Sequence, residues 1–276
     1  MTLKRSFLFV PGNNERLIYK AFQTEADSII LDLEDAVATS EKEKARDLVI
    51  SAVNNTHNKC IYVRINSVTT LWWEADMKAV IKANVDGIVL PKAEDAEIIC
   101  TMAERLPSHF DLIPLIESAK GISNATVIAT CSNKVSRLAF GALDYAMDIG
   151  VNYTKKWEWL LYARTHLVIA SHTAGIYPPV DTVYPDINDQ EGLVNELEHV
   201  KQLGMFGKLA IHPKQLTPIH DTFTPTAQEV ADAIFLIDKF EAAERTGLAS
   251  ISINGKFVDY PVYSRAKKVV ECSRYT

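Results

Sequence analysis

The sequence is poor in the residues from which disulfide frameworks and zinc sites are made. Its 276 residues include four cysteines, Cys60, Cys100, Cys131 and Cys272, and none of them belongs to a Cys-x-x-Cys pair. Disulfide scaffolds and zinc ribbons need closely spaced cysteines. Neither class of protein therefore fits this chain.

Long apolar runs and an excess of basic residues are also missing. No run approaches the roughly 20 apolar residues of a membrane-spanning helix, and the N-terminal stretch lacks the basic and apolar regions of a secretory signal. The formal net charge of −6 argues against general binding of nucleic acid. The composition, 47% hydrophobic and 23% charged, is that of an ordinary globular protein. We expect a cytoplasmic protein with neither a membrane nor a nucleic acid as its partner.

Short apolar runs alternate along the chain with stretches of helical periodicity. Most runs contain consecutive apolar residues, as expected for strands that are covered on both faces. The candidate strands are 6–10, 28–33, 60–65, 85–90, 110–116, 135–140, a weak one at 175–184, and 207–212, and the candidate helices are 14–25, 40–53, 72–83, 94–106, 119–131, 156–173 and 189–203. A strand followed by a helix every 25 to 30 residues indicates βα units and a parallel sheet. Eight such units would close a barrel.

An open, doubly wound sheet is the competing architecture, and periodicity alone does not separate the two. Such a sheet usually carries a glycine-rich nucleotide motif, G-x-G-x-x-G or G-x-x-x-x-G-K-[ST], after its first strand. Neither motif occurs in this sequence. The pattern therefore favours a (β/α)8 TIM barrel.

The pattern changes after the eighth candidate strand. Pro225 is placed to begin a helix that runs to about residue 245. The pair Asn254-Gly255, flanked by alternating residues, predicts a β-hairpin, and a last short helix is expected at 262–273. We therefore predict a catalytic barrel at 1–222 and a helical and hairpin arm at 223–276.

Polar residues gather where the predicted strands end. In a TIM barrel the carboxyl ends of the strands form the reactive face, and so many carboxylates at one rim would repel one another unless a cation lay among them. Simpler roles remain open: the acids after the second strand could pair with Lys42 or Arg46 or cap a helix, and the others could favour helix N-termini. An arginine that ends an apolar strand needs a carboxylate or an anionic ligand. The residues are Asp32, Glu34, Asp35, Arg64, Asn66, Lys92, Glu117 and Asp144.

Seven segments, in this order, resemble the successive signatures of the CitE-like acyl-CoA lyases of the HpcH/HpaI aldolase superfamily. These lyases include the citrate lyase β subunit, malyl-CoA lyase and citramalyl-CoA lyase. The resemblance runs from Arg5 to about Pro213, and INGKFVDYP in the predicted arm is similar to the family's C-terminal segment. The seven segments are RSFLFVPGNNERLIYKA, ADSIILDLEDAV with the following EKEKAR, VRIN, GIVLPKAE, LIPLIESAKGI, LAFGALDY and GKLAIHP.

The resemblance implies a TIM barrel and assigns roles to five residues at its rim. Glu117 and Asp144 correspond to the family's Mg²⁺ ligands, and Arg64 corresponds to its substrate arginine. Phe9 and Lys20 match positions that contact coenzyme A. Two carboxylates, water and a bidentate substrate suit a hard octahedral ion.

The resemblance also assigns roles to further carboxylates. Glu34 and Asp35, more than Asp32, are expected to hold metal-bound waters and to orient Lys92 or Arg64. Asp259 corresponds to an acid or base that relatives insert into the active site of a neighbouring subunit. A homo-oligomer, a trimer or a hexamer, is therefore expected.

The implied activity is Mg²⁺-dependent retro-Claisen cleavage of a 3-hydroxy-3-carboxyacyl-CoA. Citramalyl-CoA or malyl-CoA would give acetyl-CoA and a 2-oxoacid, pyruvate or glyoxylate. Three alternatives remain: the citrate lyase β subunit, which acts on a citryl group carried by an acyl carrier protein; a malyl-CoA thioesterase; and a non-catalytic assembly module. The last is disfavoured because Arg64, Glu117, Asp144 and Asp259 are all present.

Overall fold

The computed structural model describes residues 4–54, 59–154, 156 and 158–275. The chain divides into two compact units, one formed by Arg5–His220 and the other mainly by Asp221–Thr276. The sequence pattern changes at the same place, because the alternation of strand and helix ends with the eighth candidate strand.

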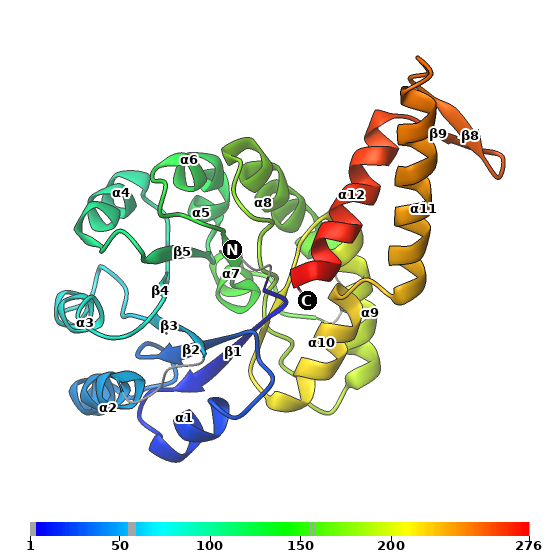
Figure 1. Cartoon of the computed structure of the whole chain (residues 1–276). Helices are drawn as coiled ribbons and strands as arrows, with labels where there is room; N and C mark the ends of the chain where they lie inside the picture. The colour runs from blue at the N-terminus through cyan, green and yellow to red at the C-terminus, as the bar shows by residue number, and fades with distance from the viewer. Residues whose placement is uncertain (1–3, 55–58, 155, 157, 276) are drawn as a thin grey trace. The chain divides into compact units, whose positions relative to one another are not determined.

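The first unit contains a seven-stranded parallel sheet in the order β6-β5-β4-β3-β2-β1-β7. Neighbours in the sheet are thus neighbours in the chain, except where β1 pairs with β7. Figure 1 shows these strands at the centre of the unit, with helices outside them. The strands are β1 (Ser6–Pro11), β2 (Ser28–Asp32), β3 (Cys60–Arg64), β4 (Gly87–Leu90), β5 (Asp111–Ile116), β6 (Ala139–Phe140) and β7 (Lys208–Ala210).

The gap between β6 and β7 is closed by two residues of the weak candidate strand at 175–184. Val180 forms a parallel bridge with Ala139 of β6, and Asp181 forms one with Lys208 of β7. Pro178 and Pro179 lack the N–H groups that would extend this pairing toward the N-terminus. The eighth member of the barrel is therefore present but short, and the prediction of an α/β TIM-barrel fold is confirmed.

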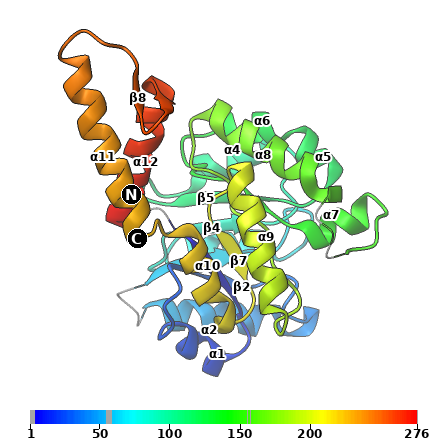
Figure 2. The ribbon, with the colours of Figure 1, turned by 90° about the vertical axis from the view of Figure 1, so that its right-hand side faces the viewer.

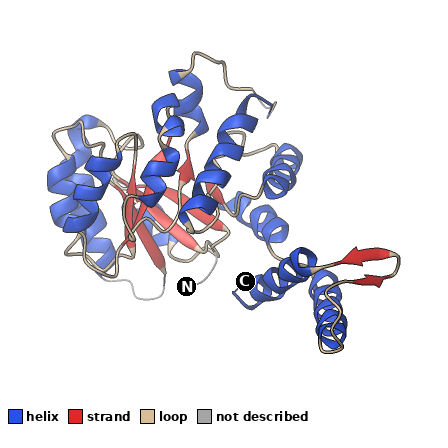
Figure 3. Cartoon of the chain, turned by 90° about the horizontal axis from the view of Figure 1, so that it is seen from above, coloured by secondary structure: helices blue, strands red, loops and turns tan. Residues whose placement is uncertain are grey.

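Helices surround the strands, as Figure 3 shows by secondary structure. Figure 2 shows α8 beside α9, which pack against each other on the outside of the sheet. The predicted helix at 119–131 is divided into two at Asn124. The helices of this unit are α1 (Glu15–Ala21), α2 (Lys42–Asn54), α3 (Trp73–Val80), α4 (Ala96–Arg105), α5 (Ala119–Ser123), α6 (Ala125–Thr130), α7 (Ala142–Asp148), α8 (Leu161–Ala174), α9 (Gln190–Leu203) and α10 (Leu216–Phe223), with 3₁₀ turns at Thr39–Glu41, Glu158–Leu160 and Pro213–Gln215.

The interior of the barrel is filled by side chains from the strands. One buried cluster has members from all seven strands of the sheet, among them Phe7, Ile30, Tyr62, Val89 and Leu115. Because successive residues of a strand point to opposite faces, each strand supplies this interior and also packs against the helices outside. The barrel is thus a packed core, and its free functional surface lies at the rim.

A buried charge cluster crosses the seam where the barrel closes. Asp181 accepts hydrogen bonds from Arg164 of α8 at 2.8 and 3.0 Å and from Lys208 of β7 at 2.6 Å. Lys208 also donates to Glu196 of α9 at 2.5 Å. Burial opposes the charge on Asp181, but the two cations lower the pKa of its carboxyl group below the ordinary value. The cluster therefore joins two helices to the shortest part of the sheet.

The second unit consists of two packed helices, α11 (Ala227–Glu244) and α12 (Tyr260–Tyr275), and a hairpin between them (Figure 1). Thr226 caps α11 and forms a capping box with Glu229, so the prediction that Pro225 is the first helical residue is wrong. The hairpin pairs β8 (Ile251–Ile253) with β9 (Lys256–Val258). Asn254 and Gly255 have φ values of 51° and 76°, as a two-residue hairpin turn requires. Within the described part of the chain, no helix has the length and apolar character needed to cross a bilayer.

Candidate active site

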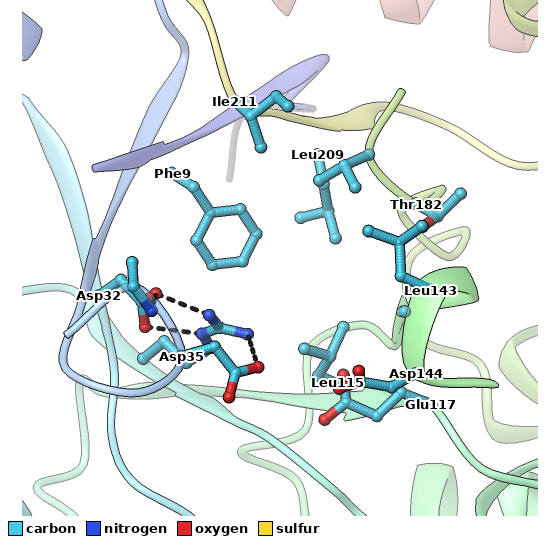
Figure 4. Close-up of a pocket in the computed structure, with 14 residues that line it drawn as sticks. Phe9, Asp32, Asp35, Leu115, Glu117, Leu143, Asp144, Thr182, Leu209 and Ile211 are labelled. Atoms are coloured by element: carbon cyan, nitrogen blue, oxygen red, sulfur yellow. Dashed lines mark hydrogen bonds and ion pairs between the residues drawn. The ribbon is translucent and has the colours of Figure 1, made fainter. Parts of the chain in front are cut away.

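A pocket of about 350 Å³ opens at the carboxyl ends of the barrel strands (Figure 4). Asp32 ends β2, Arg64 ends β3, and Glu117 follows β5 directly. Asp144 lies in the first turn of α7, which follows β6. Four predicted site residues, far apart in the sequence, therefore line one pocket because parallel strands present their ends at the same rim.

Arg64 is held in place by acids from the neighbouring strand. Asp32 and Arg64 are paired in the sheet register, and the guanidinium donates to both Asp32 oxygens, Nε to Oδ1 at 2.7 Å and Nη2 to Oδ2 at 2.6 Å. Its Nη1 lies 3.1 Å from Glu34 Oε2, and its Cζ lies 4.8 Å from the centre of the Phe9 ring. Burial favours the neutral form, but Asp32 and then Glu34 raise the pKa of Arg64 above its ordinary value. The arginine is therefore a fixed, permanently charged group of the pocket.

The contacts reverse the order expected for Asp32 and Asp35. Asp32 is 1% exposed and also accepts the backbone N–H groups of Glu34 and Ala36 at 2.9 and 3.1 Å. The Asp35 side chain is 58% exposed and its carboxylate lies 3.8 Å from Arg64. Asp32, which the sequence reasoning placed below Asp35, is the main partner of Arg64. The sequence already indicated this pairing, because Asp32 and Arg64 end two successive strands and such residues lie side by side in a parallel sheet.

Lys92 connects two carboxylates of the rim. Its Nζ donates to Glu34 Oε1 at 2.5 Å, and its backbone N–H donates to Glu117 Oε1 at 2.7 Å. Its φ of 52° lies in the left-handed region, which is unusual for a lysine and costs of order 1 kcal/mol or more. Burial, the largest effect, raises the pKa of Glu34, against the attraction of Arg64 and Lys92. Such strain at a rim residue is typical of a functional site.

Glu117 and Asp144 are two acids that line the same pocket. Burial, followed by repulsion from Asp144 and Glu34, raises the pKa of Glu117 to about 8. Gly141 leaves the space that this carboxylate occupies, because a Cβ at Gly141 would lie 2.6 Å from Glu117 Oε2 and 2.7 Å from its Cβ. Two carboxylates whose charges destabilise each other fit a divalent cation, which would remove the repulsion.

Glu117 and Asp144 provide two carboxylates, a number that often holds Mg²⁺ in enzymes. Within the described ranges, no group of three or more His, Cys, Asp or Glu residues could hold a metal ion. Mg²⁺ is commonly held by one or two carboxylates and completes its octahedron with water and substrate oxygens. Glu117 and Asp144 could therefore hold Mg²⁺. Two carboxylates are too few for a calcium site in which all ligands come from the protein.

The remaining predicted residues lie in different places. Phe9 lines the pocket and stacks on Arg64. Lys20 is exposed on α1, and its role in binding coenzyme A stays a prediction. Asp259 belongs to the second unit, where its Oδ1 accepts the backbone N–H of Val262 at 3.2 Å in the first turn of α12. Its role as an acid or base also stays a prediction.

Several residues that line the pocket were not identified from the sequence, and Thr182 and Leu143 are two of them. The Thr182 hydroxyl lines the pocket and accepts the backbone N–H of Ala142 at 2.9 Å, which positions the start of α7 and with it Asp144. Leu143 also lines the pocket, beside Asp144. Thr182 follows the two bridge residues of the weak candidate strand, and Leu143 is an apolar residue in a helix. Neither residue type in such a position indicates a functional role, so the sequence alone does not identify them.

A parallel βα barrel with Arg64 and the acids Glu117 and Asp144 in one pocket at its rim defines the class of this protein, which is that of the α/β-barrel enzymes. The model of the HpcH/HpaI aldolase/citrate lyase family matches residues 5–213. The chain therefore belongs to the HpcH/HpaI aldolase/citrate lyase family.

Similar proteins cover almost the whole chain. Citrate lyase subunit beta of Escherichia coli K12 is 36% identical over 97% of this chain and 92% of its own length. Mitochondrial citramalyl-CoA lyase of Rattus norvegicus is 30% identical over 97% of this chain and 85% of its own. The crystal structure of CitE from Mycobacterium tuberculosis in complex with magnesium, acetoacetate and coenzyme A matches with a TM-score of 0.83 and 26% identity, and covers 99% of this chain and 98% of that one. The relatives are lyases, so the family is one of enzymes.

Proposed function

We propose that this chain is a Mg²⁺-dependent carbon–carbon lyase that cleaves a 3-hydroxy-3-carboxyacyl-CoA, citramalyl-CoA or malyl-CoA, to acetyl-CoA and a 2-oxoacid. The observation that carries the proposal is the presence of Glu117, Asp144 and Arg64 in one pocket, two acids suited to a cation and one fixed guanidinium. The similarity to a CitE structure with magnesium, acetoacetate and coenzyme A supports the ligands, and the similarity to citramalyl-CoA lyase supports the reaction.

The residues present can perform the steps of this cleavage. When bound between Glu117 and Asp144, Mg²⁺ supplies Lewis acidity to the hydroxyl and carboxylate of the substrate. The hydroxyl passes its proton to solvent and becomes the carbonyl of the 2-oxoacid, while the C2–C3 bond breaks and its electron pair moves into the thioester enolate. Arg64 stabilises the negative charge that develops on oxygen, a contribution of about 3 kcal/mol for one well-placed donor.

The enolate then needs a proton at carbon, and we propose that Asp259 of a neighbouring subunit delivers it. This role requires an oligomer, a trimer or a hexamer, and Asp259 in its protonated form. Mixing Asp259→Asn subunits with Arg64→Ala subunits tests this role. In a mixed oligomer, some active sites combine the intact Arg64 of one subunit with the intact Asp259 of its neighbour. We expect verified mixed oligomers to recover part of the activity. If they recover none, Asp259 does not act in the active site of a neighbouring subunit.

The metal assignment has a direct test. Purified protein should release acetyl-CoA and pyruvate or glyoxylate only when Mg²⁺ is present, and Glu117→Ala and Asp144→Ala should lose the activity while their circular dichroism spectra stay unchanged. Glu97→Ala, at an exposed residue of α4, is a control that should keep it. Full activity after treatment with a chelator would contradict the assignment.

A second candidate function is that of a citrate lyase β subunit, which would act on a citryl group attached to an acyl carrier protein. The specific observation in its favour is the 36% identity to the Escherichia coli subunit, against 30% to the rat citramalyl-CoA lyase. Identification of the products separates the two lyase functions from a thioesterase and from an assembly module. A thioesterase would release malate and free coenzyme A, and an assembly module would cleave none of the thioesters.

A further inference from the structure

A buried lysine at the start of α2 contacts the loop that follows β2. Lys42 is the first residue of α2 and is only 7% exposed, although lysine is rarely buried in proteins unless it is paired. Its Nζ donates hydrogen bonds to the backbone carbonyl of Leu33 at 2.8 Å and to that of Glu34 at 2.7 Å. The same Nζ lies 5.8 Å from the centre of the Trp72 ring, within the range of a cation–π contact. The ammonium of Lys42 therefore holds the backbone of the loop.

The two carbonyls flank the α-carbon of Glu34. The Leu33 carbonyl and the Glu34 N–H belong to one peptide unit, whose carbonyl accepts from Lys42 and whose N–H donates to Asp32 Oδ1 at 2.9 Å. The Glu34 carbonyl belongs to the next peptide unit, and Lys42 holds this one as well. Peptide units are planar, so fixing the planes on both sides of an α-carbon fixes its φ and ψ and with them the direction of the Cα–Cβ bond. The two hydrogen bonds of Lys42 thus act on the direction of the Glu34 side chain.

The Glu34 carboxylate contacts two cations of the rim at once. Its Oε2 lies 3.1 Å from Arg64 Nη1, and its Oε1 accepts a 2.5 Å hydrogen bond from Lys92 Nζ. Arg64 ends β3 and Lys92 follows β4, so the three groups meet only when the loop after β2 has the right course. A carboxylate that serves both contacts has little freedom, and a change in its Cβ direction would lengthen at least one of them.

We infer that Lys42 is a positioning residue of the active site: through the two peptide units beside Glu34, it keeps that carboxylate between Arg64 and Lys92. An ammonium suits this role because its three N–H donors let one side chain bind both carbonyls. The inference rests on the proposed lyase function for its effect on turnover, whereas the positioning itself is a property of the folded protein. A lysine that only tied α2 to the loop would affect stability, but it would leave the contribution of Glu34 to catalysis unchanged.

Crystal structures of wild type and Lys42→Met test the positioning without a substrate. Methionine has a similar length and no N–H groups, so the Glu34 carboxylate should move beyond about 4 Å, the limit of an ion pair, from Arg64 or from Lys92. A variant in which Glu34 keeps both contacts would overturn the inference. Lys44→Met, on the same helix and with a side chain that is 74% exposed, is the matched control and should keep both contacts.

A double-mutant cycle tests the consequence for turnover. Lys42→Met and Glu34→Gln should each lower kcat/KM for the cleaved thioester at least about tenfold. Because both changes disturb the same contacts, the double variant should lose no more than about threefold beyond the larger single loss. If its loss equals the product of the two single losses, Lys42 acts independently of Glu34 and the inference is wrong. Full activity of Lys42→Met would contradict it equally, and Lys44→Met should keep the activity of wild type.

The outcomes separate this inference from the lyase function on which it rests. Wild-type protein that cleaves none of citramalyl-CoA, malyl-CoA and the citryl thioester would overturn the lyase function, and the crystal structures alone would then decide whether Lys42 positions Glu34. Wild-type cleavage with independent losses in the cycle would overturn the positioning and leave the lyase function standing. Urea unfolding measures the stability of each variant. If Lys42→Met does not fold, Lys42→Gln takes its place in both experiments, because its amide side chain is one bond shorter than that of lysine.

Discussion

The backbone N–H of Lys92 donates a 2.7 Å hydrogen bond to Glu117 Oε1, and the lysine adopts a left-handed φ of 52° at this position. Lys92 thus orients Glu117, a proposed metal ligand, through its backbone, and pairs with a second acid, Glu34, through its side chain. A glycine would adopt this conformation without strain. The contact of the lysine Nζ with Glu34 is one that a glycine at this position could not make.

Replacement of Lys92 by glycine and by alanine separates these two contributions. Lys92→Gly removes the strain and Lys92→Ala keeps it, so the glycine variant should be more stable than the alanine variant by about 1 kcal/mol. Both variants lack Nζ and should lose activity to a similar extent, at least about tenfold in kcat/KM. Urea unfolding and steady-state kinetics measure the two effects. An alanine variant that is the more stable of the pair would contradict the assigned strain.

Asp32→Asn should be more damaging than Asp35→Asn. The first change removes the carboxylate from the bidentate pair with buried Arg64, and losing one partner of such a pair costs about 3 kcal/mol. The second change affects an exposed carboxylate at 3.8 Å, where ion pairs contribute about 0–1 kcal/mol. Denaturant unfolding should show this difference, and kcat/KM should fall at least about 100-fold for Asp32→Asn only. Equal effects of the two substitutions would show that Arg64 does not depend on Asp32.

Gly141→Ala should weaken Mg²⁺ binding. The new Cβ would lie 2.6 Å from Glu117 Oε2 and 2.7 Å from Glu117 Cβ, so the Glu117 side chain must shift from its present position. A ligand displaced in this way typically lowers metal affinity by about 10–100-fold. Titration calorimetry with Mg²⁺ measures the affinity, and thermal unfolding serves as the control for folding. Unchanged affinity in a folded variant would separate Glu117 from the metal.

The ion pair between Asp27 and Arg5 should make stability depend on pH. Burial would raise the pKa of Asp27, but hydrogen bonds from the Arg5 side chain and backbone, at 2.8, 2.9 and 2.7 Å, lower it below its ordinary value. A carboxyl group whose pKa is lower in the folded state stabilises the protein above its unfolded-state pKa, near 4, and this contribution is lost as pH falls through the folded-state value.

The comparison for this prediction is between wild type and Asp27→Asn in urea unfolding at several pH values. The advantage of wild type should be complete above about pH 5 and should shrink at lower pH. Asp47→Asn, at an exposed residue of α2, is the matched control and should show a smaller advantage. A difference between wild type and Asp27→Asn that stays constant from pH 7 to pH 3 would contradict the shifted pKa.

Local patterns were sufficient for much of the fold. Consecutive apolar residues bounded by polar ones predicted the strands of the barrel, because a strand that is covered on both faces must be apolar along its length. Asn254-Gly255 predicted the hairpin, because few other pairs accept positive φ at both positions. The position of Pro225 was judged wrongly, since Thr226 with Glu229 offers side-chain acceptors for the helix N-terminus and a proline offers none.

Contacts between segments that lie far apart in the chain could not be predicted from local patterns. Four buried charged residues, Arg164 and Glu196 on two helices and Asp181 and Lys208 at the seam, lie in segments that the sequence predicts as helices and strands, and nothing local marks them as partners. Their pairing depends on which strand ends and helix faces meet when the barrel closes. Periodicity gives the faces of each element but not its partners across the fold.

The amino-acid sequence by itself determined the βα rhythm, the hairpin and the order of the motifs that place Arg64, Glu117 and Asp144 at the ends of strands, because these features depend on local spacing and residue type. Only the tertiary structure decided that Asp32 holds Arg64, that the backbone of Lys92 donates to Glu117, and that leucines line the same pocket as Glu117 and Asp144. The physical reason is that closing the barrel brings together side chains that lie tens of residues apart, and the charges and distances among them exist only after that closure.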